Sequence, residues 1–225
     1  MTERALTDRE LSSSSAEFVW DEHGASEAHG YLLAPIVSLL RRYGARTVLD
    51  LGCGNGAFSN RLREQQFEVT SMDASTSGIR IAQRSHPQMR FVLQDVTQPL
   101  PVEYHRRYDA VVSTEVIEHL LLPRALLSNA SLALRAGGCL ILSTPFHGYW
   151  KNLLLALSNR FDTHWHPLRD HGHVKFFSKA TILRLFEELG FVELGFMRVG
   201  RIPPVAKSMI VSGRLLRPAP GSPPQ

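Results

Sequence analysis

Short apolar runs alternate with helical stretches through the first two thirds of this 225-residue chain. The runs are four to seven residues long, and they are Arg46–Leu51, Glu68–Asp73, Arg90–Leu93, Tyr108–Ser113 and Gly138–Thr144. Helical patterns between them cover Phe58–Gln65, Thr76–Ser85 and Arg124–Leu134. Nearly continuous apolar strands that are interleaved with helices are typical of a parallel sheet covered on both faces. We therefore expect an α/β fold built on a mostly parallel sheet.

The end of the chain follows a different pattern. A helix is predicted over Ser178–Leu189 and is stopped by Gly190, and two strand-like runs follow, Phe191–Val199 and Lys207–Leu215. The Gly-Arg-Ile-Pro-Pro turn between these runs is too short for the helical crossover that parallel strands need. The last two strands are therefore expected to form an antiparallel hairpin.

A further helical pattern precedes the first run. Its apolar face consists of Ile36, Leu39, Leu40 and Tyr43. Pro35 suits the first turn of this helix, and Gly44 suits its C-terminal stop. Residues 1–30 are polar and predict an N-terminal arm, the domain itself is expected over 31–215, and the Pro-rich tail 216–225 is expected to be disordered.

Composition excludes several other classes of protein. The chain has no run of about 18 apolar residues, so we expect no membrane-spanning helix, and its N-terminus lacks the apolar segment of a secretory signal. The net charge of +4 comes from scattered basic residues and does not by itself indicate nucleic acid. The two cysteines, Cys53 and Cys139, have no metal or disulfide spacing, so we expect a reducing, cytoplasmic location.

The strongest local signal is the segment Val48–Gly56, in which a buried strand leads into a glycine-rich turn and then a helix. Gly52, Gly54 and Gly56 would let the backbone approach a ligand, and the helix N-terminus would present free N–H groups to it. The spacing also satisfies the dinucleotide fingerprint G-x-G-x-x-G/A, so a nicotinamide-dependent dehydrogenase is an alternative at this point.

Acidic residues at three successive strand ends favour a different ligand. Asp50, directly before the glycines, would hold an ammonium group but would repel a pyrophosphate. Asp73 ends the second strand, where a carboxylate can accept both ribose hydroxyls, and Asp95 follows the third, where it can accept from an adenine amine. The alternative is that all three merely cap helices. An amine, a ribose and an adenine without phosphate indicate S-adenosylmethionine.

Five segments resemble the successive motifs of class I S-adenosylmethionine-dependent methyltransferases, in the right order: VLDLGCGNG, SMDAS, QDVTQ, YDAVVSTEVIEHL and LRAGGCLILSTP. The resemblance covers about residues 30–215. It implies a Rossmann-like seven-stranded sheet with strand order 3-2-1-4-5-7-6 and an antiparallel last strand, which agrees with the predicted hairpin. A dehydrogenase would instead continue with parallel strand–helix units.

The resemblance also implies a cofactor site. The three glycines would line the methionine moiety, Asp73 the ribose and Asp95 the adenine. The expected cofactor-binding residues are Asp50, Gly52, Cys53, Gly54, Gly56, Asp73, Ala74, Asp95, Val96 and Thr114.

Glu115, Glu118 and His119 follow the fourth strand, and at helical spacing they would share one face. Such a group could hold Mg²⁺ or Mn²⁺, or it could pack and hydrogen-bond without metal. The segment resembles the ubiquinone-biosynthesis O-methyltransferases, which methylate a catechol-type hydroxyl. It also resembles small-RNA 3′-terminal 2′-O-methyltransferases, in which two Glu and two His hold the metal. That second resemblance implies a further histidine before the last helix, where His171 and His173 lie, and His173 completes the expected metal set.

We expect residues 145–177 to form a lid or substrate insertion, because they are rich in aromatic residues and histidines, as suits a small-molecule pocket. A helix is predicted over Trp150–Ser158, either packed on the core or lining the pocket. Since a sulfonium already activates its methyl group, the enzyme must align the acceptor and, for a hydroxyl, remove a proton. His119, His147 and His173 are the candidate catalytic residues, and they favour oxygen over nitrogen as the acceptor.

The sequence thus predicts a methyltransferase that transfers the methyl group of S-adenosylmethionine to a hydroxyl of a small molecule, such as a quinone precursor or a sugar. Two alternatives remain, a metal-dependent RNA 2′-O-methyltransferase and a non-catalytic partner protein that kept the fold. An RNA groove would interleave aromatic and basic residues, and the candidates are Trp150, Lys151, Arg160, Trp165 and Arg169. An apolar helix is the better account of Lys151–Leu157. The acceptor and the oligomeric state are not determined by the sequence.

Overall fold

A computed structural model describes residues 27–165, 168 and 172–216 of the chain. Most of the predicted arm, the tail from residue 217 and His171 lie outside the described residues. The helices and short 3₁₀ turns are α2 (Glu27–Arg42), α3 (Ala57–Glu64), α4 (Thr76–Ser85), η1 (Val102–Tyr104), η2 (Ile117–His119), α5 (Pro123–Ala133), α6 (Tyr149–Leu157), α7 (Phe161–Trp165), α8 (Lys179–Glu188) and η3 (Pro203–Val205).

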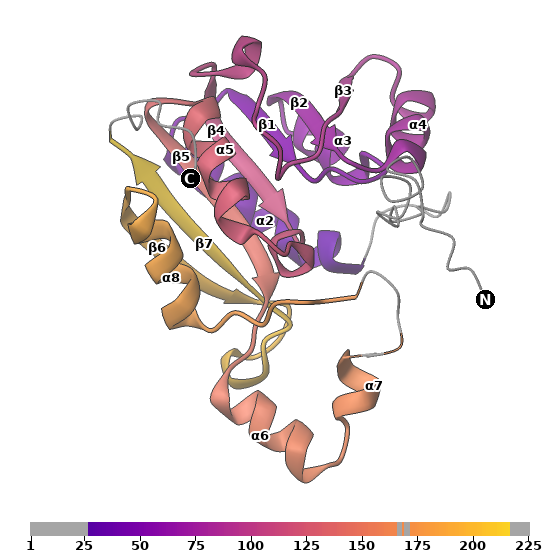
Figure 1. Ribbon diagram of the computed structural model, residues 1–225, viewed down its shortest axis with the longest axis vertical. Helices are drawn as coiled ribbons and strands as arrows, with labels where there is room; N and C mark the ends of the chain where they lie inside the picture. Colours follow the sequence, from indigo (N-terminus) through magenta and orange to yellow (C-terminus); the bar gives the residue numbers. More distant parts are fainter. Residues whose placement is uncertain (1–26, 166–167, 169–171, 217–225) are drawn as a thin grey trace, which may run out of the picture.

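Seven strands of the described part form one sheet in the order β3-β2-β1-β4-β5-β7-β6. They are β1 (Thr47–Leu51), β2 (Glu68–Asp73), β3 (Arg90–Leu93), β4 (Tyr108–Thr114), β5 (Leu134–Pro145), β6 (Phe191–Val199) and β7 (Ser208–Leu215). The first five strands pair in parallel, whereas β7 runs antiparallel to both β5 and β6. The predicted fold class, strand order and terminal hairpin are confirmed (Figure 1).

Successive side chains of the central strands point to opposite faces of the sheet, so alternate residues pack into two different apolar layers. Val48 of β1 packs in the layer that contains Ile36 of α2 and Phe58 of α3. Its neighbour Leu49 points to the opposite face, into the layer that contains Leu126 of α5 and residues of α8. Because residues on both faces of the central strands are buried, the strands appear as continuous apolar runs in the sequence.

Helix α2 differs from its prediction in where it begins. It starts at Glu27, so Pro35 lies inside the helix rather than in its first turn, and the expected boundary at residue 30 falls within the same helix. The apolar face was placed correctly, since Ile36 and Leu40 are fully buried, and Gly44 follows the helix with φ of 70°. The prediction failed because the polar first turn carries no apolar periodicity.

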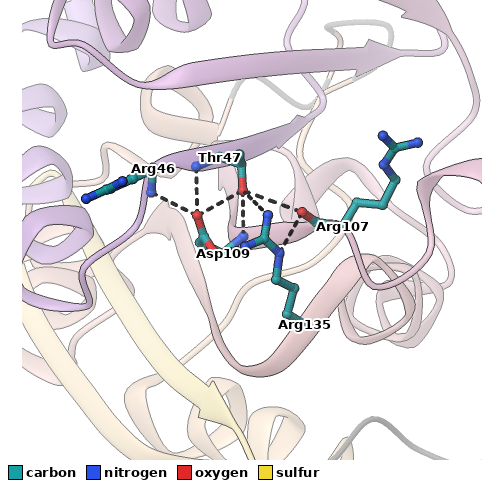
Figure 2. A network of polar contacts seen from close by, with 5 residues as sticks. All are labelled: Arg46, Thr47, Arg107, Asp109 and Arg135. Atoms are coloured by element: carbon teal, nitrogen blue, oxygen red, sulfur yellow. Dashed lines mark hydrogen bonds and ion pairs between the residues drawn. The ribbon is translucent and has the colours of Figure 1, made fainter.

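A polar network ties the amino ends of β1 and β4 together (Figure 2). Asp109 accepts hydrogen bonds from the backbone N–H groups of Arg46 and Thr47 at 3.0 and 2.9 Å, and from the Thr47 hydroxyl at 2.9 Å. Arg135 adds an ion pair to Asp109 and donates to the Arg107 carbonyl. A cavity of about 750 Å³ adjoins this network, and it therefore lies at the sheet edge opposite the carboxyl ends of the parallel strands.

Helices α6 and α7 extend beyond the carboxyl end of β5, away from the sheet (Figure 1). No residue of α6 is buried, and Leu154 and Leu157 are 54% and 77% exposed. The helix predicted over Trp150–Ser158 is therefore present, but its apolar face is not packed on the core. Among the described residues, no helix is long and apolar enough to cross a membrane.

Candidate functional site at the carboxyl edge of the sheet

The glycine-rich turn after β1 is held in a shape that only glycine adopts readily. Gly52, Gly54 and Gly56 have φ values of 87°, 54° and 78°, in the left-handed region. The Gly52 N–H donates to the Met72 carbonyl of β2 at 2.8 Å, which fixes the start of the turn. A side chain on Gly52 would collide with Val116, which follows β4, so the turn and the segment after β4 are in direct contact.

Asp50 lies at the end of β1 and is fully buried. Its Oδ2 accepts a hydrogen bond from the Ser59 hydroxyl of α3 at 2.6 Å, whereas its Oδ1 has no partner among the described residues. Burial, opposed by the Ser59 hydrogen bond, raises the pKa of Asp50 to about 7. A buried carboxylate oxygen without a donor is costly, and an ammonium group would satisfy it.

Asp73, at the end of β2, organises the same turn. Its Oδ2 accepts from the Gly54 N–H at 2.7 Å and its Oδ1 from the Ser75 N–H at 2.8 Å. A carboxylate at this strand end is a suitable acceptor for ribose hydroxyls, so Asp73 fits the ribose of the cofactor as well. The neighbouring Cys53 side chain packs instead in an apolar cluster with Phe91, and Ala74 is exposed.

The loop after β3 carries the third acid. Asp95 is exposed, and its Oδ1 accepts from both the backbone N–H and the hydroxyl of Thr97, at 2.8 and 2.7 Å. Val96 is buried in the core. The loop is also held by Asn129 of α5, a residue that the sequence analysis did not identify. An asparagine inside an otherwise apolar helix face was the available signal.

Glu115 does not share a face with Glu118, in contrast to the helical spacing predicted for this segment. Thr114 ends β4 and is buried, and Glu115 follows it with a left-handed φ of 55°. The Glu115 carboxylate accepts from the hydroxyls of Ser143 and Ser208 at 2.8 and 3.1 Å, on the β5–β7 side. Burial raises the pKa of Glu115 to about 7, although the two hydroxyls act against the shift.

Glu118, His119 and His173 do come together. Their possible ligand atoms all lie within 4.8 Å of one another, and the two imidazole rings meet edge to face with centroids 4.8 Å apart. The Glu118 carbonyl accepts from the N–H groups of Val174 and Lys175, which docks the segment carrying His173 against η2. The structure thus brings together three of the four residues expected to bind a metal, with Glu115 directed elsewhere.

Glu118 is the buried member of this group, at 1% exposure. Its Oε2 accepts from the Thr144 hydroxyl at 3.0 Å, and its Oε1 has no partner among the described residues. Burial, together with the nearby charge of Glu115, raises the pKa of Glu118 well above its ordinary value. A metal ion or an additional hydrogen-bond donor would pair with the Oε1 atom and offset the cost of burying the Glu118 charge.

His147, after β5, lies apart from that group and is 8% exposed. Its ring packs edge to face against Phe176 and near Trp165, with centroid distances of 5.1 and 6.5 Å. Neither ring nitrogen has a partner among the described residues, and burial together with the charge of Lys151 lowers the pKa of His147 to about 4. Such an imidazole stays neutral at pH 7 and is a weak base.

A family model described as a methyltransferase domain matches residues 23–194. The chain is 28% identical over 155 residues to the ubiquinone biosynthesis O-methyltransferase of Paramagnetospirillum magneticum, and the match covers 68% of this chain but only 62% of that relative.

Two solved structures share the fold. The methyltransferase domain of bacterial-CtHen1-CN aligns with a TM-score of 0.62 at 21% identity, covering 81% of this chain and 97% of that one. Magnesium protoporphyrin IX methyltransferase (ChlM) from Synechocystis PCC 6803 with bound S-adenosylhomocysteine aligns with a TM-score of 0.60 at 22% identity, covering 81% of each chain.

Proposed function

The chain belongs to the family of methyltransferase domains, and we propose that it transfers a methyl group from S-adenosylmethionine to a hydroxyl oxygen of a small-molecule acceptor. One observation carries the proposal. The segment after β4, which holds Glu118 and His119, packs directly on the glycine turn after β1 through Val116 and Gly52. Proton-accepting groups therefore adjoin the expected position of the cofactor.

The residues present fit the cofactor. Asp50 offers a buried carboxylate oxygen for the ammonium group, the glycine turn offers close backbone approach, and Asp73 and Asp95 lie at the next two strand ends. When bound, S-adenosylmethionine supplies a methyl group already activated by its sulfonium. The chain's own task is then to orient the acceptor and remove its proton.

His119 is suited to accept that proton. Its Nδ1 lies 3.3 Å from the Gly172 carbonyl, which can only accept a hydrogen bond. In the neutral ring Nδ1 therefore carries the hydrogen and Nε2 the lone pair. His173 packs on the ring and supports its orientation. His147, with its low pKa and aromatic surroundings, fits a role in the acceptor pocket wall rather than as the base.

The insertion between β5 and α8 favours an acceptor with apolar bulk. It begins at the carboxyl edge of β5, and several of its large apolar side chains are exposed, with Tyr149 at 73%, Trp150 at 63% and Phe176 at 48%. Aromatic surfaces combined with a few polar groups are typical of small-molecule pockets. The relative from Paramagnetospirillum, named for ubiquinone biosynthesis, supports an aromatic hydroxyl as acceptor.

A metal-assisted version of the reaction is a second candidate, favoured by the convergence of Glu118, His119 and His173. These residues would hold a divalent cation such as Mg²⁺ or Mn²⁺, which when bound lowers the pKa of a coordinated hydroxyl. This donor set leaves room for two vicinal oxygens. A catechol presents such a pair, and so does the terminal ribose diol of an RNA.

The test begins with calorimetric titration of S-adenosylhomocysteine into the protein. Transfer of labelled methyl from S-adenosylmethionine is then measured with 3,4-dihydroxybenzoate, an aliphatic alcohol, benzylamine and a short RNA, each with and without Mn²⁺. We expect binding, and label in an ether product of the dihydroxybenzoate.

Label only on the amine would overturn the choice of oxygen, and label on the RNA terminus would overturn the choice of a small molecule. Absence of S-adenosylhomocysteine binding would favour the non-catalytic alternative. His119→Ala should lose transfer and retain S-adenosylhomocysteine binding, whereas the exposed control Glu187→Gln on α8 should change neither.

A further inference from the structure

The backbone of the loop between β3 and η1 accepts hydrogen bonds from, and donates one to, a buried side chain, Asn129 of α5, which is 5% exposed. Its Nδ2 donates to the carbonyls of Val96 and Gln98, at 2.8 and 2.7 Å. Its Oδ1 accepts from the backbone N–H of Leu100 at 3.1 Å. All the hydrogen-bonding capacity of the side-chain N–H₂ is thus used on the backbone of a single short loop.

Few other side chains could make this set of contacts. Two donors and an acceptor within one short planar group are available from asparagine, whereas aspartate lacks the donors and leucine lacks all three. Without the amide, the buried Val96 carbonyl and Leu100 N–H would be left unpaired, an arrangement that native proteins avoid, and the part-buried Gln98 carbonyl would lose its side-chain donor. The loop backbone position therefore depends on Asn129.

That backbone carries Asp95, one residue before the first carbonyl held by Asn129. Thr97 occupies the Oδ1 atom of Asp95 through two hydrogen bonds. The Oδ2 atom accepts no hydrogen bond from the described residues. We infer that Asn129 is a positioning residue for cofactor specificity: it fixes the loop so that Asp95 Oδ2 meets the exocyclic amine of adenine.

This inference rests on the proposed function, because it assumes that the loop after β3 faces the base of the cofactor. Its consequence is a specificity that depends on a residue out of contact with the ligand. Adenine presents an amine to the carboxylate, whereas hypoxanthine presents a carbonyl oxygen, which the carboxylate repels. A site built to pair with a hydrogen-bond donor rejects an analogue that lacks it.

The experiment compares dissociation constants for S-adenosylhomocysteine and S-inosylhomocysteine by calorimetry. We expect the wild-type protein to prefer the adenine form at least about tenfold, and Asn129→Leu to reduce that preference about fivefold or more. Asp95→Ala should remove the preference, and adding Asn129→Leu to Asp95→Ala should reduce it no further, since both act on one contact. Asn129→Gln keeps the amide but displaces it, and it tests the same point if the leucine variant does not fold.

The control is Ile36→Ala, which removes a fully buried side chain from the apolar layer on the opposite face of the sheet. It should lower the melting temperature and leave the adenine preference intact. An unchanged preference in the foldable Asn129 variants would overturn the inference, as would a wild-type protein that binds both ligands equally. A wild-type protein that binds neither ligand would instead overturn the proposed function.

Discussion

Gly52 in the turn after β1 and Val116 after β4 are packed so closely that a Cβ atom on Gly52 would collide with Val116 Cγ2. Gly52 also has φ of 87°, so two separate constraints apply at one position. The contact matters because it joins the expected cofactor turn to the segment that carries Glu118 and His119. Substitutions at the pair separate the steric constraint from the conformational one.

We expect Gly52→Ala to lower the free energy of unfolding by about 2–5 kcal/mol, from left-handed strain plus overlap with Val116. Gly137→Ala is the matched control, because Gly137 has φ of 79° and open space around its Cβ position. It should cost only about 1–2 kcal/mol. Chemical denaturation measures both. Equal losses in the two variants would show that the Val116 contact contributes nothing, and Gly52→Ala with Val116→Ala should regain part of the difference.

Asp50 should make cofactor affinity depend on pH. Burial raises its pKa to about 7, and the cofactor's ammonium group prefers the ionised carboxylate. The affinity for S-adenosylhomocysteine should therefore rise as pH increases from about 5 to about 7, by at most about tenfold per unit. Asp50→Asn should bind more weakly and show no such rise. A pH profile that is the same in both proteins would contradict the assignment of Asp50.

The same group has an opposite effect on folding. Because the folded protein holds the Asp50 proton more tightly than the unfolded chain, its contribution to stability is greatest below the ordinary pKa of 3.8 and declines as pH rises toward 7. Asp50→Asn, which resembles the protonated carboxyl, should therefore be nearly as stable as the wild type at pH 4 and clearly more stable at pH 8. Thermal unfolding at both values provides the measurement.

Glu115 and Glu118 should respond differently to a metal titration. The Glu115 carboxylate is engaged by Ser143 and Ser208, whereas Glu118 lies with His119 and His173. In protein pre-bound to S-adenosylhomocysteine, calorimetry should detect no saturable heat of Mn²⁺ binding for Glu118→Gln. The Glu115→Gln variant should retain that heat. Loss in both variants would restore the four-ligand set expected from the sequence. Absence of heat in the wild type would remove the metal-assisted candidate.

Asp109 should contribute more to the free energy of unfolding than Arg135, which lies beside it (Figure 2). Its three hydrogen bonds to Arg46 and Thr47 join β1 to β4, and their loss in Asp109→Ala should cost about 2–3 kcal/mol. Arg135→Ala removes a half-exposed ion pair and should cost less than about 1 kcal/mol. Urea denaturation compares the two, and equal costs would contradict this ranking. Binding of S-adenosylhomocysteine should be unchanged in both variants.

The contribution of the Asp109 carboxylate to stability should decrease at acidic pH. Against the effect of burial, the hydrogen bonds from Thr47 and Arg46 lower the pKa of Asp109, so its contribution is lost as pH falls through that lowered value. The stability difference between wild type and Asp109→Ala should therefore be largest above the ordinary pKa of 3.8 and shrink below it. A difference that persists at pH 2 would indicate that packing, rather than the carboxylate, ties the strands together.

The predicted strands and helices mostly agree with the observed ones, because each central strand is buried on both faces and carries its own apolar signal. Helix α2 shows the limit of that reasoning. Its first turn is polar, so periodicity placed Pro35 at the start of the helix, whereas the helix begins eight residues earlier at Glu27. Helix α6 shows another limit, since an apolar run indicates a helix without indicating whether anything covers it.

Local patterns and the common direction of parallel strands are enough to predict the α/β architecture, the glycine turn and the acids at successive strand ends, because those features bring the residues to one edge of the sheet. Which neighbours of the site act together depends on the three-dimensional packing. Glu115 and Glu118 are three residues apart, yet a left-handed φ at Glu115 sends one carboxylate toward Ser143 and leaves the other beside His173. Asn129 reaches the loop after β3 across about thirty residues of chain. Contacts of that kind depend on how the layers pack, so a pattern along the chain can mark such a residue without identifying its partner.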